Sequence, residues 1–243
     1  MKTLENMIAV VTGGSGAIGS AIIACLEQQG ACAVSLDVAR PAGGTAPFQP
    51  CDVRDDGSVA SAIAEVQHKY GRLDLVIHAA GVSREAVLWK LAVEDWDFVQ
   101  SVNLRGAFLL LRHAIPVMRT GEGGRIVLIG SINGSRGKFG TSAYSASKAG
   151  LIALAKTVAR EVARLKILIN VVEPGWVRTP LTEGLPQAVR DAALAESLVG
   201  RYVEPADVAA AVSFLCGPGA QQITGQILRV DGGQWDPAAR SRS

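Results

Sequence analysis

Ile8-Ala9-Val10-Val11-Thr12-Gly13-Gly14-Ser15-Gly16-Ala17-Ile18-Gly19 is the stretch that decides the fold of this chain. Its β-branched first part predicts a buried strand, and the apolar pattern from Ala17 to Gln29 predicts a helix. The glycines between them allow a tight turn and a close approach to a phosphate, beside the positive end of the helix dipole. The spacing Gly14-x-Gly16-x-x-Gly19 matches the dinucleotide-binding fingerprint, and the strand before it and the helix after it are the context that the fingerprint requires.

The rest of the chain repeats this alternation of short apolar runs and longer helical patterns. Strands are expected at 33–36, 48–53, 73–78, 125–129, 167–172 and 226–230, and helices at 56–70, 93–119 (with a break near 103), 143–163 and 205–216. Such alternation is typical of a parallel sheet with helices on both faces. We therefore predict one α/β domain over 1–243, a Rossmann-like doubly wound sheet, with a substrate loop at about 175–200 and a flexible tail at 236–243.

Composition limits the classes of function. The net charge of +2 calls for neither nucleic acid nor an acidic membrane surface, and 49% apolar residues allow a sizeable core. The four cysteines are scattered and the three histidines isolated, so we expect reduced thiols and no metal site. No signal peptide or membrane-spanning run is visible, which predicts a cytoplasmic protein with no membrane partner.

Asp37 ends the second expected strand, 18 residues after Gly19. A carboxylate there accepts hydrogen bonds from the adenine ribose diol and repels a 2′-phosphate. The glycine turn contains no arginine that would receive such a phosphate, so we expect NAD(H) rather than NADP(H). Arg40 lies close by and argues in the other direction.

Tyr144-Ser145-Ala146-Ser147-Lys148 lies in an expected helix and places a phenol and an ammonium one turn apart on the same face. A cation near a phenol favours the phenolate and lowers the pKa of the tyrosine. Tyr144 is therefore a candidate proton donor or acceptor near neutral pH.

Taken together, these motifs resemble the short-chain dehydrogenase/reductase family over nearly the whole chain, from Met7 to Trp235. The family's catalytic tetrad matches Asn103, Ser131, Tyr144 and Lys148. The resemblance implies that Ser131 and Tyr144 bind the substrate oxygen, that Lys148 binds the nicotinamide ribose, and that Asn103 anchors a water leading to solvent. The cofactor contacts that the motifs imply are Gly13, Ser15, Gly16, Ala17, Ile18, Gly19, Asp37, Asp52, Val53, Ala79, Ala80, Gly81, Tyr144, Lys148, Pro174, Gly175, Val177 and Thr179.

The chain departs from the family pattern in three places besides Ala17, which takes the sixth place of the family's Thr-Gly-x-x-x-Gly-x-Gly turn. The family's Asn-Asn-Ala-Gly is His78-Ala79-Ala80-Gly81 here, so the hydrogen bonds of the asparagines are lost or replaced by His78. The connection after Asp37 contains Pro41-Ala42-Gly43-Gly44 and is too short for the helix that the family often has there. Glu173, which precedes Pro174-Gly175, either tunes the charge beside the nicotinamide or pairs with Lys166 or Arg178; we favour the pairing.

The segments around Gly81, Trp96 and Tyr144 are similar to those of 3-oxoacyl carrier-protein reductases and acetoacetyl-CoA reductases. This similarity implies an oxidoreductase for a 3-oxoacyl thioester and its 3-hydroxyacyl form. A dehydrogenase of a small or cyclic secondary alcohol is the alternative, and a non-catalytic cofactor-binding sensor or scaffold is the alternative of another class. The sequence leaves open the substrate, the direction of reaction, and carrier protein versus CoA.

Three further expectations concern the surface of the protein and its substrate loop. Arg125, Arg164 and Lys166 either form a basic patch for an acidic carrier protein or CoA phosphates, or are solvated surface charge. The resemblance implies a homotetramer with helices 104–119 and 143–163 at its interface. Apolar side chains in the substrate loop either line a pocket or pack in the core; these are Trp176, Leu181, Leu185 and Leu194.

Overall fold

The computed structural model describes residues 3–40 and 44–234. Within these residues, seven parallel strands form one sheet in the order β3-β2-β1-β4-β5-β6-β7. The strands are β1 (Ile8–Thr12), β2 (Cys32–Asp37), β3 (Phe48–Pro50), β4 (Leu75–His78), β5 (Gly124–Ile129), β6 (Ile167–Pro174) and β7 (Ile227–Val230). The strand order reverses at β1 and β4, which is the crevice where doubly wound sheets bind ligands.

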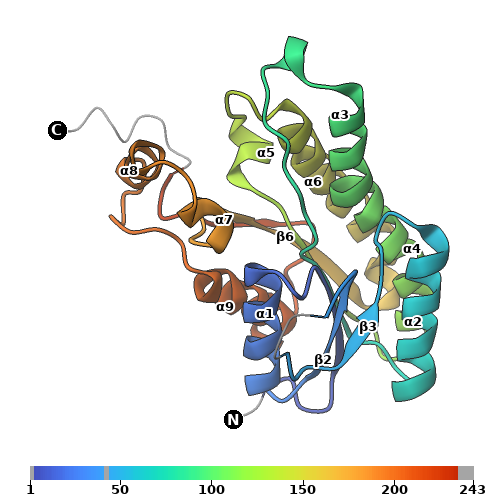
Figure 1. The fold of residues 1–243 in the computed structure, drawn as a ribbon. Coiled ribbons are helices and arrows are strands. Elements are labelled where there is room, and N and C mark those ends of the chain that lie inside the picture. The colour runs from blue at the N-terminus through green and yellow to red at the C-terminus, as the bar shows by residue number, and fades with distance from the viewer. Residues whose placement is uncertain (1–2, 41–43, 235–243) are drawn as a thin grey trace.

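Helices cover both faces of this sheet, as predicted (Figure 1). In Figure 1, α1 and α9 lie on one face, and α2 and α4 on the other. The helices are α1 (Ala17–Gln28), α2 (Asp56–Tyr70), α3 (Val93–Gln100), α4 (Gly106–Met118), α5 (Ile132–Arg136), α6 (Ser142–Val162), α7 (Pro180–Glu183), α8 (Gln187–Ala195) and α9 (Pro205–Cys216). The shorter turns are η1 (Leu88–Lys90), η2 (Ser101–Arg105), η3 (Ala163–Leu165) and η4 (Pro218–Ala220).

The strand sequences read as continuous apolar runs because the sheet is buried on both faces. All five residues of β1 are buried, and successive side chains point to opposite sides. Val10 and Ile126 enter the core under α2, α4 and α6, while Val11 and Val127 enter the core under α1 and α9. These two cores fix the sheet and hold the carboxyl ends of its strands at one edge.

Secondary structure departs from the expectations in a few places. The break near Asn103 is the π-helical turn η2, in which the N–H of Gly106 donates to the carbonyl of Ser101 five residues back. The substrate loop contains two short helices, α7 and α8, whose patterns are too brief to be recognised in sequence. Helix α5 has only five residues and was missed for the same reason.

Two expectations concern residues outside the described ranges: the tail 236–243, and Pro41-Ala42-Gly43 of the β2–β3 connection. Across 3–40 and 44–234, no helix is both long and apolar enough to span a bilayer. Between Asp37 and β3, residues 38–40 and 44–47 are not helical, as the composition predicted.

Candidate active site

The glycine turn between β1 and α1 is built for close approach. Gly13 has a φ of +65°, and a Cβ on it would lie 2.7 Å from the backbone nitrogen of Ala80. A Cβ on Gly19 would collide with the carbonyl of Gly13. In the part of the chain that the structure describes, no side chain caps α1 at Gly16, so the N–H groups of its first turn are left for a ligand. This cradle fits the pyrophosphate of a dinucleotide.

Asp37 lies beside this turn, at the end of β2. Its carboxylate accepts hydrogen bonds from the N–H of Ser15 (3.0 Å) and the N–H of Val38 (2.8 Å). The acidic side chain is therefore held next to the glycine turn, where an adenine ribose would lie. The Arg40 guanidinium instead lies over the ring of Phe48, 5.0 Å from its centroid.

The other predicted cofactor residues follow the carboxyl ends of neighbouring strands. Asp52 and Val53 follow β3. Arg54 forms an ion pair with the Asp52 carboxylate and lowers the pKa of that carboxylate. The Val53 side chain is buried. Segment 79–81 follows β4. Pro174 is the last residue of β6, and residues 175–179 follow that strand. Because all these strands are parallel, the predicted contacts meet at one edge of the sheet.

Ser131 and Tyr144 meet at this same edge. Ser131 follows β5 and caps α5, its Oγ accepting the N–H of Asn133 at 3.2 Å. The Tyr144 phenol, near the start of α6, lies close enough to the Ser131 side chain for that hydroxyl to act on the pKa of the phenol and lower it. Two hydroxyl groups from different elements therefore converge, as binding of a substrate oxygen requires.

The expectation that Lys148 lowers the pKa of Tyr144 is wrong. Burial raises the pKa of the Tyr144 phenol, and only the hydrogen bond to Ser131 opposes that rise, while the charge of Glu85 adds to it. The Lys148 Nζ donates to the carbonyl of Ile129 at 2.8 Å and lies 5.6 Å from the centroid of the Tyr144 ring. The phenol therefore keeps its proton and is ready to act as an acid.

Lys148 is almost completely buried, with 3% of its surface exposed. Burial lowers the pKa of its ammonium from 10.5 to about 8. A Cβ added to Gly81 would lie 3.3 Å from the Lys148 Nζ, so the loop after β4 passes directly over the ammonium. A ligand that enters this edge meets a lysine whose charge is poorly solvated and available for pairing.

Asn103 belongs to η2, and its side chain links the segment after β4 to helix α6. Its Oδ1 accepts the N–H of Val82 (2.8 Å), and its Nδ2 donates to the carbonyl of Val82 (3.0 Å) and to the Oγ of Ser147 (2.9 Å). Ser147 donates in turn to the carbonyl of Tyr144 at 2.7 Å. Sequence reasoning missed Ser147; the signal was its position one helical turn after Tyr144.

His78 replaces the lost asparagine hydrogen bonds, one of the two outcomes expected. The ring is fully buried and lies between Thr12 (Oγ1 to Nδ1, 3.0 Å) and the backbone carbonyl of Asn103 (Nε2 to O, 3.2 Å). Burial, and secondarily the charge of Lys148, lowers the pKa of His78 to about 3. The imidazole is therefore neutral.

Glu173 forms an ion pair, as we favoured, but its partner is neither Lys166 nor Arg178. Its buried carboxylate accepts hydrogen bonds from the Oγ of Ser135 (2.6 Å) and from the Nε of Arg229 (3.3 Å). Arg178 pairs with Glu204 instead, and Lys166 lies at the opposite end of β6. The partner comes from β7, because only strand pairing places Arg229 directly opposite Glu173.

Gln234, another residue that the sequence analysis missed, braces the substrate loop. Its side chain accepts the N–H of Trp176 (2.7 Å) and donates to the carbonyl of Ala193 (2.8 Å). The Lys138 ammonium lies 5.1 Å from the centroid of the Trp176 ring, which joins the loop after α5 to the substrate loop. The loop is therefore held over the edge where Tyr144 and Lys148 lie.

Of the four apolar side chains singled out in the substrate loop, the three that the structure describes are not buried in the core. Leu185 is 39% exposed, and Trp176 and Leu194 are half-buried. The Leu181 side chain is outside what the structure describes. Core packing therefore does not explain Leu185.

The basic residues singled out in sequence do not line the site. Arg125 lies at the amino end of β5, and Arg164 and Lys166 lie just before β6 begins. Catalytic residues follow the carboxyl ends of the strands, at the opposite edge. A carrier protein bound at these three residues would not lie beside Tyr144 of the same chain.

Candidate metal ligands are dispersed. His68 is exposed on α2, and His113 on α4 pairs with Asp56 at 2.8 Å. Across the ranges that the structure describes, no group of three or more His, Cys, Asp or Glu side chains is placed to hold a metal ion.

Comparison with known proteins agrees with this geometry. A family model described as enoyl-(acyl carrier protein) reductase matches residues 15–234. The chain is 35% identical to 3-oxoacyl-[acyl-carrier-protein] reductase FabG of Thermotoga maritima, with 95% of this chain and 98% of the relative covered. It is 38% identical to acetoacetyl-CoA reductase of Synechocystis sp., with 94% and 96% covered.

Solved structures agree as well. The crystal structure of gox2181 matches with a TM-score of 0.91 at 30% identity, covering 95% of this chain and 96% of that one. Ligand-free aldohexose dehydrogenase of Thermoplasma acidophilum matches with a TM-score of 0.90 at 29% identity, covering 96% and 95%. Both matches cover at least 95% of this chain.

Proposed function

The chain belongs to the short-chain dehydrogenase/reductase family, and on that premise we propose that it interconverts a 3-oxoacyl thioester and its 3-hydroxyacyl form with NAD(H). The observation that carries the proposal is the convergence of Ser131, Tyr144 and Lys148 beside the glycine turn. Relatives named for 3-oxoacyl and acetoacetyl thioesters support the substrate class. The likeness to an aldohexose dehydrogenase keeps a small cyclic alcohol as the second candidate.

Nicotinamide, when bound, supplies or accepts the hydride. Residues of the chain orient the substrate and handle one proton. In reduction, the Ser131 and Tyr144 hydroxyls donate hydrogen bonds to the carbonyl oxygen as negative charge develops on it. The Tyr144 phenol, which burial keeps protonated, then gives its proton to that oxygen. Lys148, whose ammonium donates to the Ile129 carbonyl, would hold the nicotinamide ribose.

Preference for NAD(H) is supported by the placement of Asp37. The glycine turn, the free N–H groups of α1 and the segments after β3, β4 and β6 would hold the rest of the cofactor. A 2′-phosphate would meet the Asp37 carboxylate, since that side chain is held by Ser15 and Val38.

Replacing Asp37 should therefore reverse cofactor discrimination. Hydrogen bonds to a charged group contribute about 1.5–3 kcal/mol, so Asp37→Ala should weaken NADH binding roughly 10- to 100-fold. NADPH binding should improve, because the repulsion is removed. Both dissociation constants are measured by cofactor fluorescence.

Asp37→Asn is the matched control, because it keeps the shape and an acceptor atom while removing the charge. Its NADH affinity should lie between those of wild type and the alanine variant. Stronger binding of NADPH than NADH by the wild-type protein would contradict the proposed preference.

A paired substrate screen tests the proposed reaction. NADH and NADPH are each combined with acetoacetyl-CoA, an acyl-carrier substrate and simple cyclic ketones, and absorbance of the reduced cofactor is followed. The greatest turnover is expected with a thioester and NADH. Turnover only with cyclic ketones would favour the second candidate. Cofactor binding without turnover, together with capture of a carrier protein, would favour the sensor or scaffold.

A homotetramer is also proposed, with α4 and α6 at its interface. In support, Phe108 on α4 leaves 47% of its surface exposed, so an apolar side chain of that helix is available to an interface. Sizing chromatography with light scattering gives the mass directly.

A further inference from the structure

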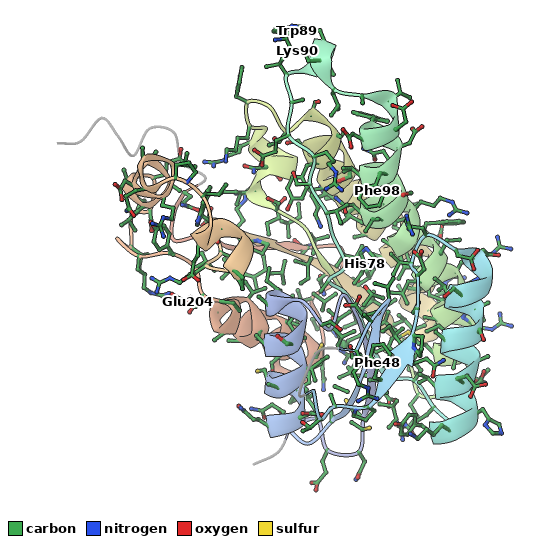
Figure 2. All side chains as sticks on the ribbon, in the orientation of Figure 1. Phe48, His78, Trp89, Lys90, Phe98 and Glu204 are labelled. Atoms are coloured by element: carbon green, nitrogen blue, oxygen red, sulfur yellow. The ribbon has the colours of Figure 1, made fainter. Side chains whose placement is uncertain are left out.

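His78 lies where a cofactor-binding segment and the catalytic tetrad come closest together. It ends β4 and pairs in register with Thr12, the last residue of β1 before the glycine turn. Figure 2 places it near the centre of the molecule, far from the tip that carries Trp89 and Lys90. A polar ring in such a position must be satisfied by hydrogen bonds.

Partners of the ring determine the direction of each hydrogen bond. The Asn103 carbonyl can only accept, so the Nε2 of His78 carries the hydrogen and donates to it. The neutral ring then accepts at Nδ1 from the Thr12 hydroxyl. The Thr12 Oγ1 is free to accept the N–H of Ala80 at 3.3 Å. Each polar atom of the ring has one partner of the right kind.

Asn103 extends this network to the proton donor. Its side chain holds both backbone groups of Val82 and the hydroxyl of Ser147, and Ser147 donates to the Tyr144 carbonyl. The hydrogen bond of the π-helical turn η2 spans five residues where that of an α-helix spans four, and such turns recur at functional sites. His78 is the side chain that contacts the Asn103 carbonyl across this turn.

We propose that His78 is a positioning residue: by donating its Nε2–H to the Asn103 carbonyl, it orients Asn103 and, through Ser147, the helix turn that carries Tyr144. The bond to Thr12 selects the tautomer that makes this donation possible. The kinetic part of this proposal rests on the proposed function, but the placement of Asn103 does not.

Two amide variants separate the two hydrogen bonds of the ring. In His78→Gln, the terminal amide nitrogen can take the place of Nε2 and still donate to Asn103. In His78→Asn, the shorter side chain can take the place of Nδ1 and still accept from Thr12, but it does not reach Asn103. His78→Phe keeps a ring of similar size and removes both bonds, and it measures the loss of the whole network.

The expected result is a difference between the amide variants. His78→Asn and His78→Phe should lower kcat about 10-fold or more, the effect of leaving one buried carbonyl without its donor, with the KM for cofactor within about threefold. His78→Gln should keep kcat within about threefold of wild type. Equal kcat in both amide variants, or loss in the glutamine variant alone, would overturn the proposal.

Hydrogen exchange gives a readout that needs no substrate. The Val82 N–H, bonded to Asn103, should exchange faster in His78→Asn than in His78→Gln. The Gly130 N–H, bonded to the Val172 carbonyl at 2.7 Å outside this network, is the reference and should stay protected in both. Faster exchange at both amides in both variants would mean general destabilisation and would overturn the positioning role. If no substrate is found, the exchange rates still show whether His78 positions Asn103. Failure of the proposed reaction is thereby distinguished from failure of the positioning role.

Discussion

Tyr144→Phe is expected to lower kcat about 10²- to 10⁴-fold, the range for loss of a general acid, while cofactor affinity stays within about threefold. The change removes one oxygen, the only group of Tyr144 that exchanges a proton, and keeps the ring that packs near Lys148. Ser131 alone would then bind the substrate oxygen and would have no proton to give at neutral pH. Steady-state turnover and a cofactor binding isotherm measure both quantities.

A tyrosine elsewhere provides the matched control for this substitution. Tyr70 ends α2, away from the carboxyl edge of the sheet, and Tyr70→Phe should leave kcat unchanged. The pH profile adds a second control, because burial raises the pKa of the Tyr144 phenol and the donor should stay protonated through neutral pH. Wild-type turnover by Tyr144→Phe would remove Tyr144 from the mechanism.

Lys148→Met is expected to make the protein more stable and less active. A buried ammonium whose pKa falls from 10.5 to about 8 costs about 3 kcal/mol of folding free energy at neutral pH. Methionine has no charge to desolvate, but it leaves the Ile129 carbonyl without a donor, so a net gain of about 1–2 kcal/mol is expected. Activity should fall at least about 10- to 100-fold with the loss of a charged hydrogen-bond donor.

The pH dependence of unfolding identifies Lys148 as the cause. Between pH 8 and 10.5 the lysine of the unfolded chain keeps its proton and that of the folded chain has lost it, so the free energy of unfolding rises with pH in this window. The difference in unfolding free energy between Lys148→Met and wild type should therefore shrink from pH 7 to pH 10. Denaturant titrations at three pH values measure it, and a constant difference would show that the lysine is not desolvated. Lys156→Met, at an exposed position of α6, is the control.

Secondary structure was largely predictable, because the strands and long helices have local signals. The run Ile8–Thr12 is apolar throughout, since β1 is buried on both faces, and Asp55 and Gly71 mark both ends of α2 with an N-cap and a left-handed C-cap. Helix α7 has only four residues, too few to be recognised in sequence, and α8 is held by a distant contact, since Gln234 donates to the carbonyl of Ala193.

Most residues of the candidate site were also predictable from their type and spacing in the sequence. Glycines, Asp37 and the Tyr144–Lys148 pair occupy places that parallel topology brings to one edge of the sheet. The predicted shift in the pKa of Tyr144 had the wrong direction. The sequence places the Lys148 ammonium one helical turn away, but only the structure shows that this ammonium donates to the Ile129 carbonyl. Burial is a property of the whole fold, and here it outweighs a neighbour in sequence.

By itself, then, the amino-acid sequence determined the sheet and the edge at which the glycine turn, Asp37, Tyr144 and Lys148 lie, because strand periodicity, glycine spacing and helical repeat act over a few residues. Asn103 and Ser131 were indicated by the family resemblance. Tertiary structure alone decided the partners: Arg229 for Glu173, Ser147 for Asn103, and Asn103 for His78. Each of these pairs joins elements separated by more than 20 residues, and a buried polar group takes whichever complementary atom the packing of the sheet and helices places within reach.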